Sequence, residues 1–309
     1  MQPVLVVGET LVDIVHTPDG QVSEHVGGSP ANVAMGVARL GHDTSLATTL
    51  GDDEHGRQCR EQITDHGVVI ENLDAGSHAT STAAATIDDS GAATYDFDLH
   101  WKLHPVADLG AFGHVHTGSI AATLTPGAEV VAQTLTEARA HATVSYDPNA
   151  RPSIMGEPDT VRPQIESLIA LSDVVKASED DTEWLYAGRS LPDVMAAWGA
   201  LGPSLVVVTR GGDGVAYRVT ATGEFGEAPT RAESVADTVG AGDSFMAGLI
   251  SGLLDAGLLG DADARDRLAA SSLADVEGAI SRALATSAIT VGHAGAYAPT
   301  REEIEKDHG

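Results

Sequence analysis

Basic residues are scarce in this chain of 309 amino acids. It has 17 Lys and Arg, only three of them lysines, against 45 Asp and Glu, so the formal net charge is 17 − 45 = −28. An acidic surface repels phosphate at long range, so we expect neither a nucleic acid nor an anionic membrane as a partner. Any anion that binds must therefore be held mainly by backbone amides, arginine or metal ions.

Cysteine and long apolar runs are also nearly absent. Cys59 is the only cysteine, which excludes an intrachain disulfide and a cysteine-rich metal site. No apolar run approaches the roughly 20 residues that span a bilayer. The N-terminal segment lacks the basic start of a signal peptide, so we expect a cytoplasmic protein. With 42% hydrophobic residues, the chain suits one large globular domain.

Aromatic residues make up only 4% of the chain, but several gather in residues 92–101. There Tyr95, Phe97, Leu99 and Trp101 alternate with polar residues, so a largely aromatic face is predicted on one side of a strand. This strand forms a hairpin with residues 80–87 through a turn at 88–91. A second hairpin joins residues 12–17 and 21–26 through Pro18-Asp19-Gly20, whose residue types favour a turn. We expect the two hairpins to form a small separate sheet, a lid over about 12–26 and 80–101.

Elsewhere short apolar segments alternate with helical ones. Strands are predicted at 4–7, 44–50, 114–117, 143–146, 173–176, 205–209 and 214–219. Helices are predicted at 31–40, 126–141, 163–171, 182–186, 191–201, 244–256 and 268–287. Repeated strand–helix units favour an α/β fold with a mostly parallel sheet covered by helices on both faces. No linker interrupts residues 1–309, so one domain is expected.

The strongest local motif is DTVGAGDSF at residues 237–245, which runs directly into an apolar helix. Gly240 and Gly242 let successive backbone N–H groups converge, and the helix start adds its positive dipole end, which favours an anion. Asp243 beside such a site fits a base that takes a proton from a group attacking the anion. The alternative is a tight turn with Asp243 as the N-cap.

A second motif, GGSPAN at 27–32, ends the first hairpin and opens a helix. Gly27 and Gly28 allow a ligand to approach the backbone closely, and Asn32 offers a donor and an acceptor to a sugar hydroxyl. A plain helix start, with Ser29 as N-cap and Pro30 as the first helical residue, accounts for the same pattern.

These two segments, GGSPANVAMGVARLG (27–41) and DTVGAGDSFMAGLI (237–250), resemble the signature motifs of the PfkB, or ribokinase-like, family of carbohydrate kinases. The motifs stand in the expected order, and the resemblance extends over nearly the whole chain. The stretch SYDPNARP (145–152) is most similar to the fructokinase branch. The resemblance implies a ribokinase-like three-layer α/β/α core with a small β lid.

It also implies that a sugar hydroxyl attacks the γ-phosphate of ATP in a cleft between core and lid. Asp243 is then the catalytic base, and the residues before it form an anion hole: Gly240, Ala241 and Gly242. The implied sugar-binding residues are Asp13, Gly27, Gly28, Asn32, Tyr95, Phe97 and Arg151. For Arg151 a surface position is an equal alternative. Tyr95 and Phe97 alternatively pack against the core or a second subunit, since relatives dimerise through the lid.

The implied nucleotide-binding residues are Ser178, Thr209, Gly211, Gly212, Gly214, Gly240 and Gly242. A plain hairpin turn also accounts for the glycines at 211–214. The resemblance implies that Asp237 and Thr238 belong to a K⁺ site and that Asp181 assists Mg²⁺. Here the chain departs from the family pattern Asn-x-x-Glu, because Ser178 replaces Asn and Asp181 replaces Glu.

The leading hypothesis is therefore an ATP-dependent sugar kinase of the fructokinase type. A 2-keto-3-deoxygluconate kinase or a ribokinase is the alternative within the class. A keto acid would require a cation such as Arg151 near its carboxylate. A non-catalytic sugar- or nucleotide-binding protein on the same fold is the alternative from another class, and the retained Asp243 argues against it.

Overall fold

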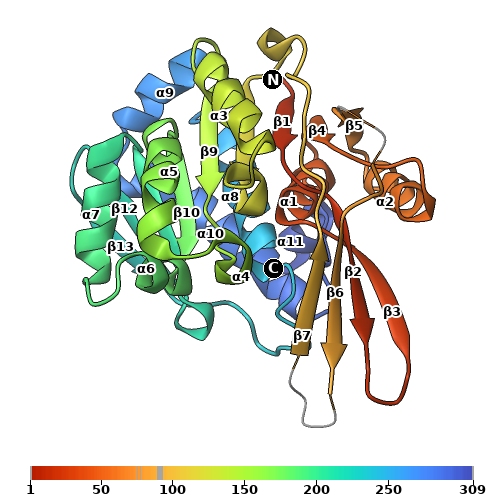
Figure 1. The fold of residues 1–309 in the computed structure, drawn as a ribbon. Helices are drawn as coiled ribbons and strands as arrows, with labels where there is room; N and C mark the ends of the chain where they lie inside the picture. The colour runs from red at the N-terminus through yellow and green to blue at the C-terminus, as the bar shows by residue number, and fades with distance from the viewer. Residues whose placement is uncertain (1, 75, 77, 89–92, 308–309) are drawn as a thin grey trace.

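Two sheets organise the chain in the computed structural model, which describes residues 2–74, 76, 78–88 and 93–307 (Figure 1). The larger sheet has the strand order β13 (Phe225–Ala228), β12 (Val215–Val219), β11 (Leu205–Thr209), β10 (Val174–Ser178), β9 (Thr143–Asp147), β8 (His114–Gly118), β1 (Val4–Val7), β4 (Thr44–Thr48) and β5 (Val69–Asn72). The strands from β11 to β5 run parallel, and β12 and β13 continue the sheet in antiparallel fashion. The predicted, mostly parallel sheet is confirmed.

Helices cover both faces of this sheet (Figure 1). One face packs against α1 (Ser29–Arg39), α8 (Ala241–Asp255), α10 (Leu273–Val291) and α11 (Arg301–Asp307), with α2 (Glu54–Asp65) and α9 (Ala262–Ala269) at its margins. The other face packs against α3 (Gly127–Ala138), α5 (Pro158–Ala170), α6 (Glu179–Leu185) and α7 (Leu191–Leu201). Because both faces are covered, β1, β8 and β9 are buried along their whole length.

Most helices begin or end a few residues from the predicted positions, and three of these differences have a clear local cause. α8 begins at Ala241 because Gly240, at φ 74°, ends the preceding turn in the left-handed region. α5 begins at Pro158, which suits a first helical residue, and contains Pro163 within it. The single helix predicted at 268–287 is wrong: α9 and α10 separate there, because Ser272 and Asp275 form a capping box that starts a new helix.

The smaller sheet has the order β3 (Val22–Gly27), β2 (Leu11–His16), β6 (Thr82–Ile87) and β7 (Ala93–Asp98), and it extends from one side of the core (Figure 1). β2–β3 and β6–β7 are antiparallel hairpins, as predicted, and β2 pairs with β6 in parallel. The turn predicted at 88–91 lies, apart from Asp88, outside the described residues.

The aromatic face predicted for residues 95–101 is only partly confirmed. β7 ends at Asp98, so Tyr95 and Phe97 share a strand face, and their rings stack 5.9 Å apart. Trp101 instead is buried in the core of the large sheet, where its Nε1 donates to the Ala121 carbonyl at 2.9 Å. The chain leaves the strand because this large ring gains more burial in the core.

No helix in the part of the chain that the structure describes has the length and apolar character needed to cross a membrane.

Candidate active site

The first turn of α8 contains the residues of the DTVGAGDSF motif. Asp243 is the third helical residue, and Gly240 is the N-cap, so the alternative of Asp243 as N-cap is wrong. Gly240 has a second constraint besides its φ, because a Cβ atom there would lie 2.6 Å from that of Ala296. Only glycine therefore fits the turn that opens this helix.

The amides of this first turn are not all free to bind an anion. Those of Ala241 and Ser244 donate to the carbonyls of Thr238 and Gly240, at 3.2 and 2.8 Å. The first amides of a helix have no partner within it, so those of Gly242 and Asp243 remain. The Ala241 amide, which belongs to a residue of the anion hole implied by the family motif, is thus engaged within its own turn.

The Asp243 carboxylate is held by two side chains of α1, more than 200 residues away in sequence. Ser29 Oγ donates to its Oδ1 at 2.6 Å, and Asn32 Nδ2 donates to its Oδ2 at 2.8 Å. Asp243 is only 8% exposed. Ser29 was predicted as the N-cap of α1, which is wrong, because Gly28 is the cap at φ 104° and Ser29 turns toward Asp243 instead.

Asn32 links this carboxylate to the main cleft of the molecule. Its Nδ2 is used by Asp243, while its buried Oδ1 has no hydrogen-bond partner among the described residues. Since a buried unpaired carbonyl is costly, this oxygen is suited to accept a hydroxyl of a bound molecule. Asn32 therefore lies between the Asp243 carboxylate and the cleft.

The cleft has a volume of about 1100 Å³ and lies between the smaller sheet and the core. It brings together most of the predicted sugar-binding residues: Asp13, Gly27, Asn32, Tyr95, Phe97 and Arg151, with Asp237. Gly27 is next to Asp13, whose carboxylate occupies the place of a side chain at this position, since a Cβ would lie 2.2 Å from its Oδ2. A Cβ on Gly28 would likewise lie 2.5 Å from the Glu9 carbonyl oxygen.

Five of the seven predicted nucleotide residues lie at or just after the carboxyl ends of β10 and β11, and the other two, Gly240 and Gly242, lie at the start of α8. Thr209 ends β11, and a short turn of 3₁₀ helix (Gly211–Asp213) follows, with Gly211 and Gly214 at positive φ. Ligands of open α/β sheets bind beyond such strand ends. The residues at these strand ends do not line the 1100 Å³ cleft. They lie beside it, at the edge of the large sheet where the parallel strands end.

Ser178 and Asp181 close the N-terminus of α6. Ser178 Oγ accepts the amide of Asp181 at 3.0 Å, and Asp181 Oδ2 accepts the amide of Ser178 at 2.8 Å. The other oxygen of Asp181 accepts the amide of Ala150 at 2.7 Å. Ser178 and Asp181 therefore cap the N-terminus of α6, a structural role that we did not predict from the sequence.

Asp237 connects the DTVGAGDSF motif to the segment after α10 through hydrogen bonds. Its carboxylate accepts the amides of Val239 and Gly295, at 3.0 and 2.8 Å, and the hydrogen bond from Gly295 contributes most to lowering its pKa. Asp237 is therefore ionised at neutral pH. In residues 2–74, 76, 78–88 and 93–307, no three His, Cys, Asp or Glu side chains gather as a metal site.

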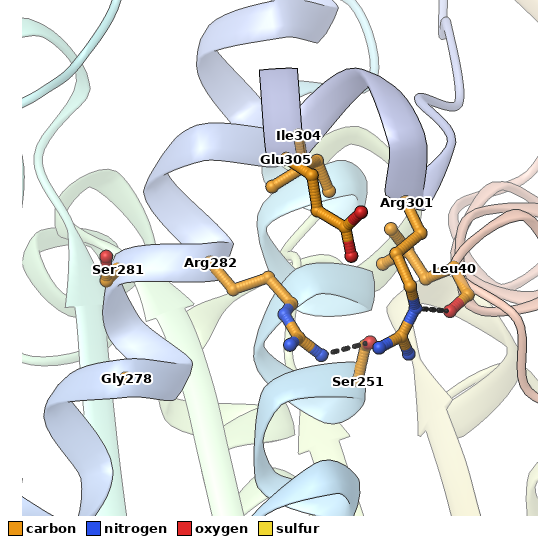
Figure 2. A pocket seen from close by; sticks show the side chains of 8 residues that line it. All are labelled: Leu40, Ser251, Gly278, Ser281, Arg282, Arg301, Ile304 and Glu305. Carbon is orange, nitrogen blue, oxygen red and sulfur yellow. Dashed lines mark hydrogen bonds between the residues drawn. The ribbon is translucent and has the colours of Figure 1, made fainter. Parts of the chain in front are cut away.

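A second cavity, of about 150 Å³, lies at the far end of α8 and includes none of the predicted site residues (Figure 2). Its two arginines already have partners. Arg282 Nη1 donates to Ser251 and Asp255, and Arg301 donates to the Leu40 carbonyl and to Asp255. This cavity therefore marks the place where α1, α8, α10 and α11 are joined.

The model of the pfkB family carbohydrate kinases matches residues 1–303. The chain belongs to this family. Fructokinases of Klebsiella pneumoniae and Escherichia coli are 33% and 31% identical to this kinase. The matches cover 82% of the chain and 85% of the first relative, and 98% of both the chain and the second.

The solved structures agree on the fold. The ATP-bound fructokinase of Xylella fastidiosa superposes with a TM-score of 0.84 at 24% identity, covering 99% of this chain and 98% of that one. A fructokinase double mutant of Vibrio cholerae with fructose, ADP and a potassium ion has a TM-score of 0.79 at 26% identity, over 99% and 98%. The predicted ribokinase-like fold and the enzyme class of carbohydrate kinase are confirmed.

Sequence reasoning missed a buried ion pair beside the motif. Lys176 Nζ donates to Asp147 Oδ2 at 2.8 Å, and the side chains are 4% and 0% exposed. The available signal was a lysine within the otherwise apolar strand segment VVKAS of a lysine-poor chain. Glu9 was also missed. It is buried, accepts the amide of Ala121 at 3.0 Å, and burial raises its pKa to about 8.

Proposed function

We propose that this kinase transfers the γ-phosphoryl group of ATP to a hydroxyl of a neutral sugar of the fructose type. The observation that carries the proposal is the placement of the Asp243 carboxylate at the start of α8, held by Ser29 and by the cleft residue Asn32. This one group lies in the first turn of a helix and is hydrogen-bonded to a residue that lines the cleft.

Asp243 acts as the general base in this proposal. Hydrogen bonds from Ser29 and Asn32 fix the carboxylate, so its orientation is set before the sugar binds. It takes the proton of the attacking hydroxyl as the oxygen approaches phosphorus, an effect that contributes about 10²–10⁴ in rate. The free amides of Gly242 and Asp243 stabilise the charge on the transferring phosphoryl group.

The charge of the cleft favours a neutral acceptor. Its lining includes four carboxylates but only two arginines: Asp13, Glu24, Asp65 and Asp237, against Arg39 and Arg151. A sugar phosphate or a keto acid would face a net negative surface. Arg151 donates its Nη1 to Asn149 and to the Ala150 carbonyl, so it is engaged in its own loop. The fructokinase relatives support the same choice.

The lid completes the sugar site. Asp13 and Asn32 provide polar partners for hydroxyls, and the stacked rings of Tyr95 and Phe97 cover the apolar face of the sugar. Tyr95 is 60% exposed in the single chain. This exposure suits closure over a sugar, and it also suits a homodimer formed through the lid.

ATP is proposed to lie along the strand ends at Ser178, Thr209 and the 211–214 glycines. Magnesium binds nucleotides through their phosphates and keeps several waters, so it needs no preformed cage of side chains. Potassium is proposed near Asp237 and Thr238, where the ionised Asp237 holds the 292–297 segment in place. The potassium ion in the Vibrio cholerae structure supports this part.

The test is release of ADP with a panel of fructose, ribose and 2-keto-3-deoxygluconate, with and without K⁺. Fructose should give the highest kcat/KM. Sugar-independent ADP release alone, or none with any sugar, would overturn the proposal. Activity confined to the keto acid would replace fructose by the alternative acceptor.

A further inference from the structure

Lys176 is a cation in an unusual place. It lies in the middle of β10, between residues that are buried, and its side chain is almost fully enclosed. Its Nζ donates to Asp147 Oδ2 at 2.8 Å, and Asp147 is its one hydrogen-bond partner among the described residues. A lysine ammonium carries three donor hydrogens, so the pair leaves donor capacity unused.

The ammonium lies close to the first turn of α8. A Cβ atom on Gly242 would come within 3.1 Å of Lys176 Nζ, closer than an ordinary contact. The glycine therefore leaves the room that the lysine fills. Since Gly242 provides one of the two free amides of the proposed anion hole, the ammonium lies next to a residue of that hole.

The charges around this point are unbalanced. The field of Asp147, Asp181 and Asp243 outweighs the effect of burial and raises the pKa of Lys176, so the lysine is charged. Burial raises the pKa of Asp147 to about 6, so this carboxylate is ionised at neutral pH. Its Oδ1 has no partner among the described residues. A polyphosphate arriving here would meet three carboxylates and a single lysine.

We propose that Lys176 is the fixed positive charge of the anion hole, a positioning residue that acts through Gly242 and offsets Asp243 when the phosphoryl charge develops. Asp147 holds the ammonium in place. This inference rests on the proposed phosphate site at the start of α8. A preorganised charge in a water-excluded site is effective because it needs no rearrangement during the reaction.

The competing account is that the pair only joins β9 to β10. The two accounts predict different activities for a variant in which both residues of the pair are uncharged. Lys176→Met alone leaves Asp147 buried without its partner, which destabilises the fold. Lys176→Met with Asp147→Asn removes both charges, and such replacements are often neutral for stability. If the pair only joins strands, activity returns together with stability in the double variant.

The experiment measures AMP, ADP and a non-hydrolysable ATP analogue by calorimetry, for the wild type, Lys176→Met and the double variant, with thermal unfolding alongside. We expect the double variant to unfold near the wild-type temperature. Its affinity for the ATP analogue should fall about 10-fold or more, while AMP affinity changes less than about 2-fold. In turnover, kcat/KM for ATP should fall about 10²-fold, the range for losing one electrostatic donor, with the sugar KM unchanged.

An equal loss for all three nucleotides, or no loss, would overturn the inference. So would recovery of kcat/KM in the double variant. The binding series does not need turnover, so it decides the role of Lys176 even if no sugar is phosphorylated. A wild type that binds the nucleotides but phosphorylates no sugar would count against the proposed function alone.

Discussion

The charged groups at the two ends of α8 are paired in opposite ways: the carboxylate at the C-terminal end is partly exposed and shared by two arginines, and the ion pair near the N-terminal end is buried. At its C-terminal end, Asp255 Oδ2 accepts Arg282 and Arg301, both at 2.6 Å, and these hydrogen bonds outweigh burial and lower its pKa. The arginines also bond Ser251 and the Leu40 carbonyl (Figure 2). Near the N-terminal end, within the part of the chain that the structure describes, Lys176 has one hydrogen-bond partner and one oxygen of Asp147 has none.

In our proposal, the C-terminal end of α8 contributes to stability and its N-terminal end contributes to catalysis. A cluster whose donors and acceptors are all used holds helices together and has little left for a ligand. A cluster with unused capacity costs stability until a ligand completes it. We therefore expect changes at the C-terminal end to act on unfolding and changes at the N-terminal end to act on turnover.

Replacing the proposed base should have the largest effect. Asp243→Asn keeps the shape and the contact with Ser29 but cannot take a proton, so kcat should fall about 10²–10⁴-fold. Steady-state ADP release measures this, and thermal unfolding should change little. Retention of more than about a third of the wild-type kcat would remove Asp243 from the role of base.

Glu9 differs from the charged groups at both ends of α8, because this buried carboxyl group has no salt bridge in the described part of the chain. Burial raises its pKa from 4.5 to about 8, so the folded state retains a proton that the unfolded state loses as pH rises. Wild-type stability should therefore decline between pH 4.5 and 8, by about 5 kcal/mol at most.

Glu9→Gln has no proton to lose, so its stability relative to the wild type should increase through that window. Urea unfolding at pH 5 and pH 8.5 compares the two proteins. The same difference between them at both pH values would show that Glu9 does not titrate in this window.

At the C-terminal end of α8, Asp255→Asn should lower the free energy of unfolding by about 2 kcal/mol, because it leaves two arginines without their shared carboxylate. Activity at a temperature where the variant is folded should stay within about 2-fold of the wild type. A selective loss of kcat would contradict the separation between the two ends.

Asn32 tests the link between the base and the cleft. Asn32→Ala removes a donor to Asp243 and a buried oxygen that has no partner among the described residues, so the sugar KM should rise about 10-fold, the loss of one good hydrogen bond. The KM for ATP should change far less. Equal increases in both KM values would place Asn32 outside the sugar site.

The smallest expected effect concerns the net charge of −28. The acidic surface opposes the approach of ATP, and salt screens this repulsion with a Debye length of about 8 Å at physiological ionic strength. Moderate NaCl, at constant K⁺ and Mg²⁺, should strengthen binding of an ATP analogue by about 2-fold. A steady loss of affinity instead would indicate that the positive field of the anion hole dominates at long range.

Much of this architecture follows from local patterns. The alternation of apolar strands and helices predicts the parallel sheet, because strands buried on both faces must be apolar throughout. The turn chemistry of Pro18-Asp19-Gly20 predicts the first lid hairpin, and the two glycine motifs predict where a phosphate and a sugar approach the backbone. These features are encoded by neighbours in sequence, so one sequence suffices to find them.

Only the tertiary structure decided which side chains of the candidate site contact one another. Ser29 and Asn32 reach Asp243 across 214 and 211 residues, and Lys176 reaches Asp147 only because β9 and β10 are neighbours in the sheet. Such contacts depend on strand order and helix packing, which the spacing of apolar residues along a short segment does not specify. The scarcity of lysine pointed to a phosphate site made of backbone amides. The fold places one of the three lysines next to Gly242 in this turn, because the glycine leaves the space for it.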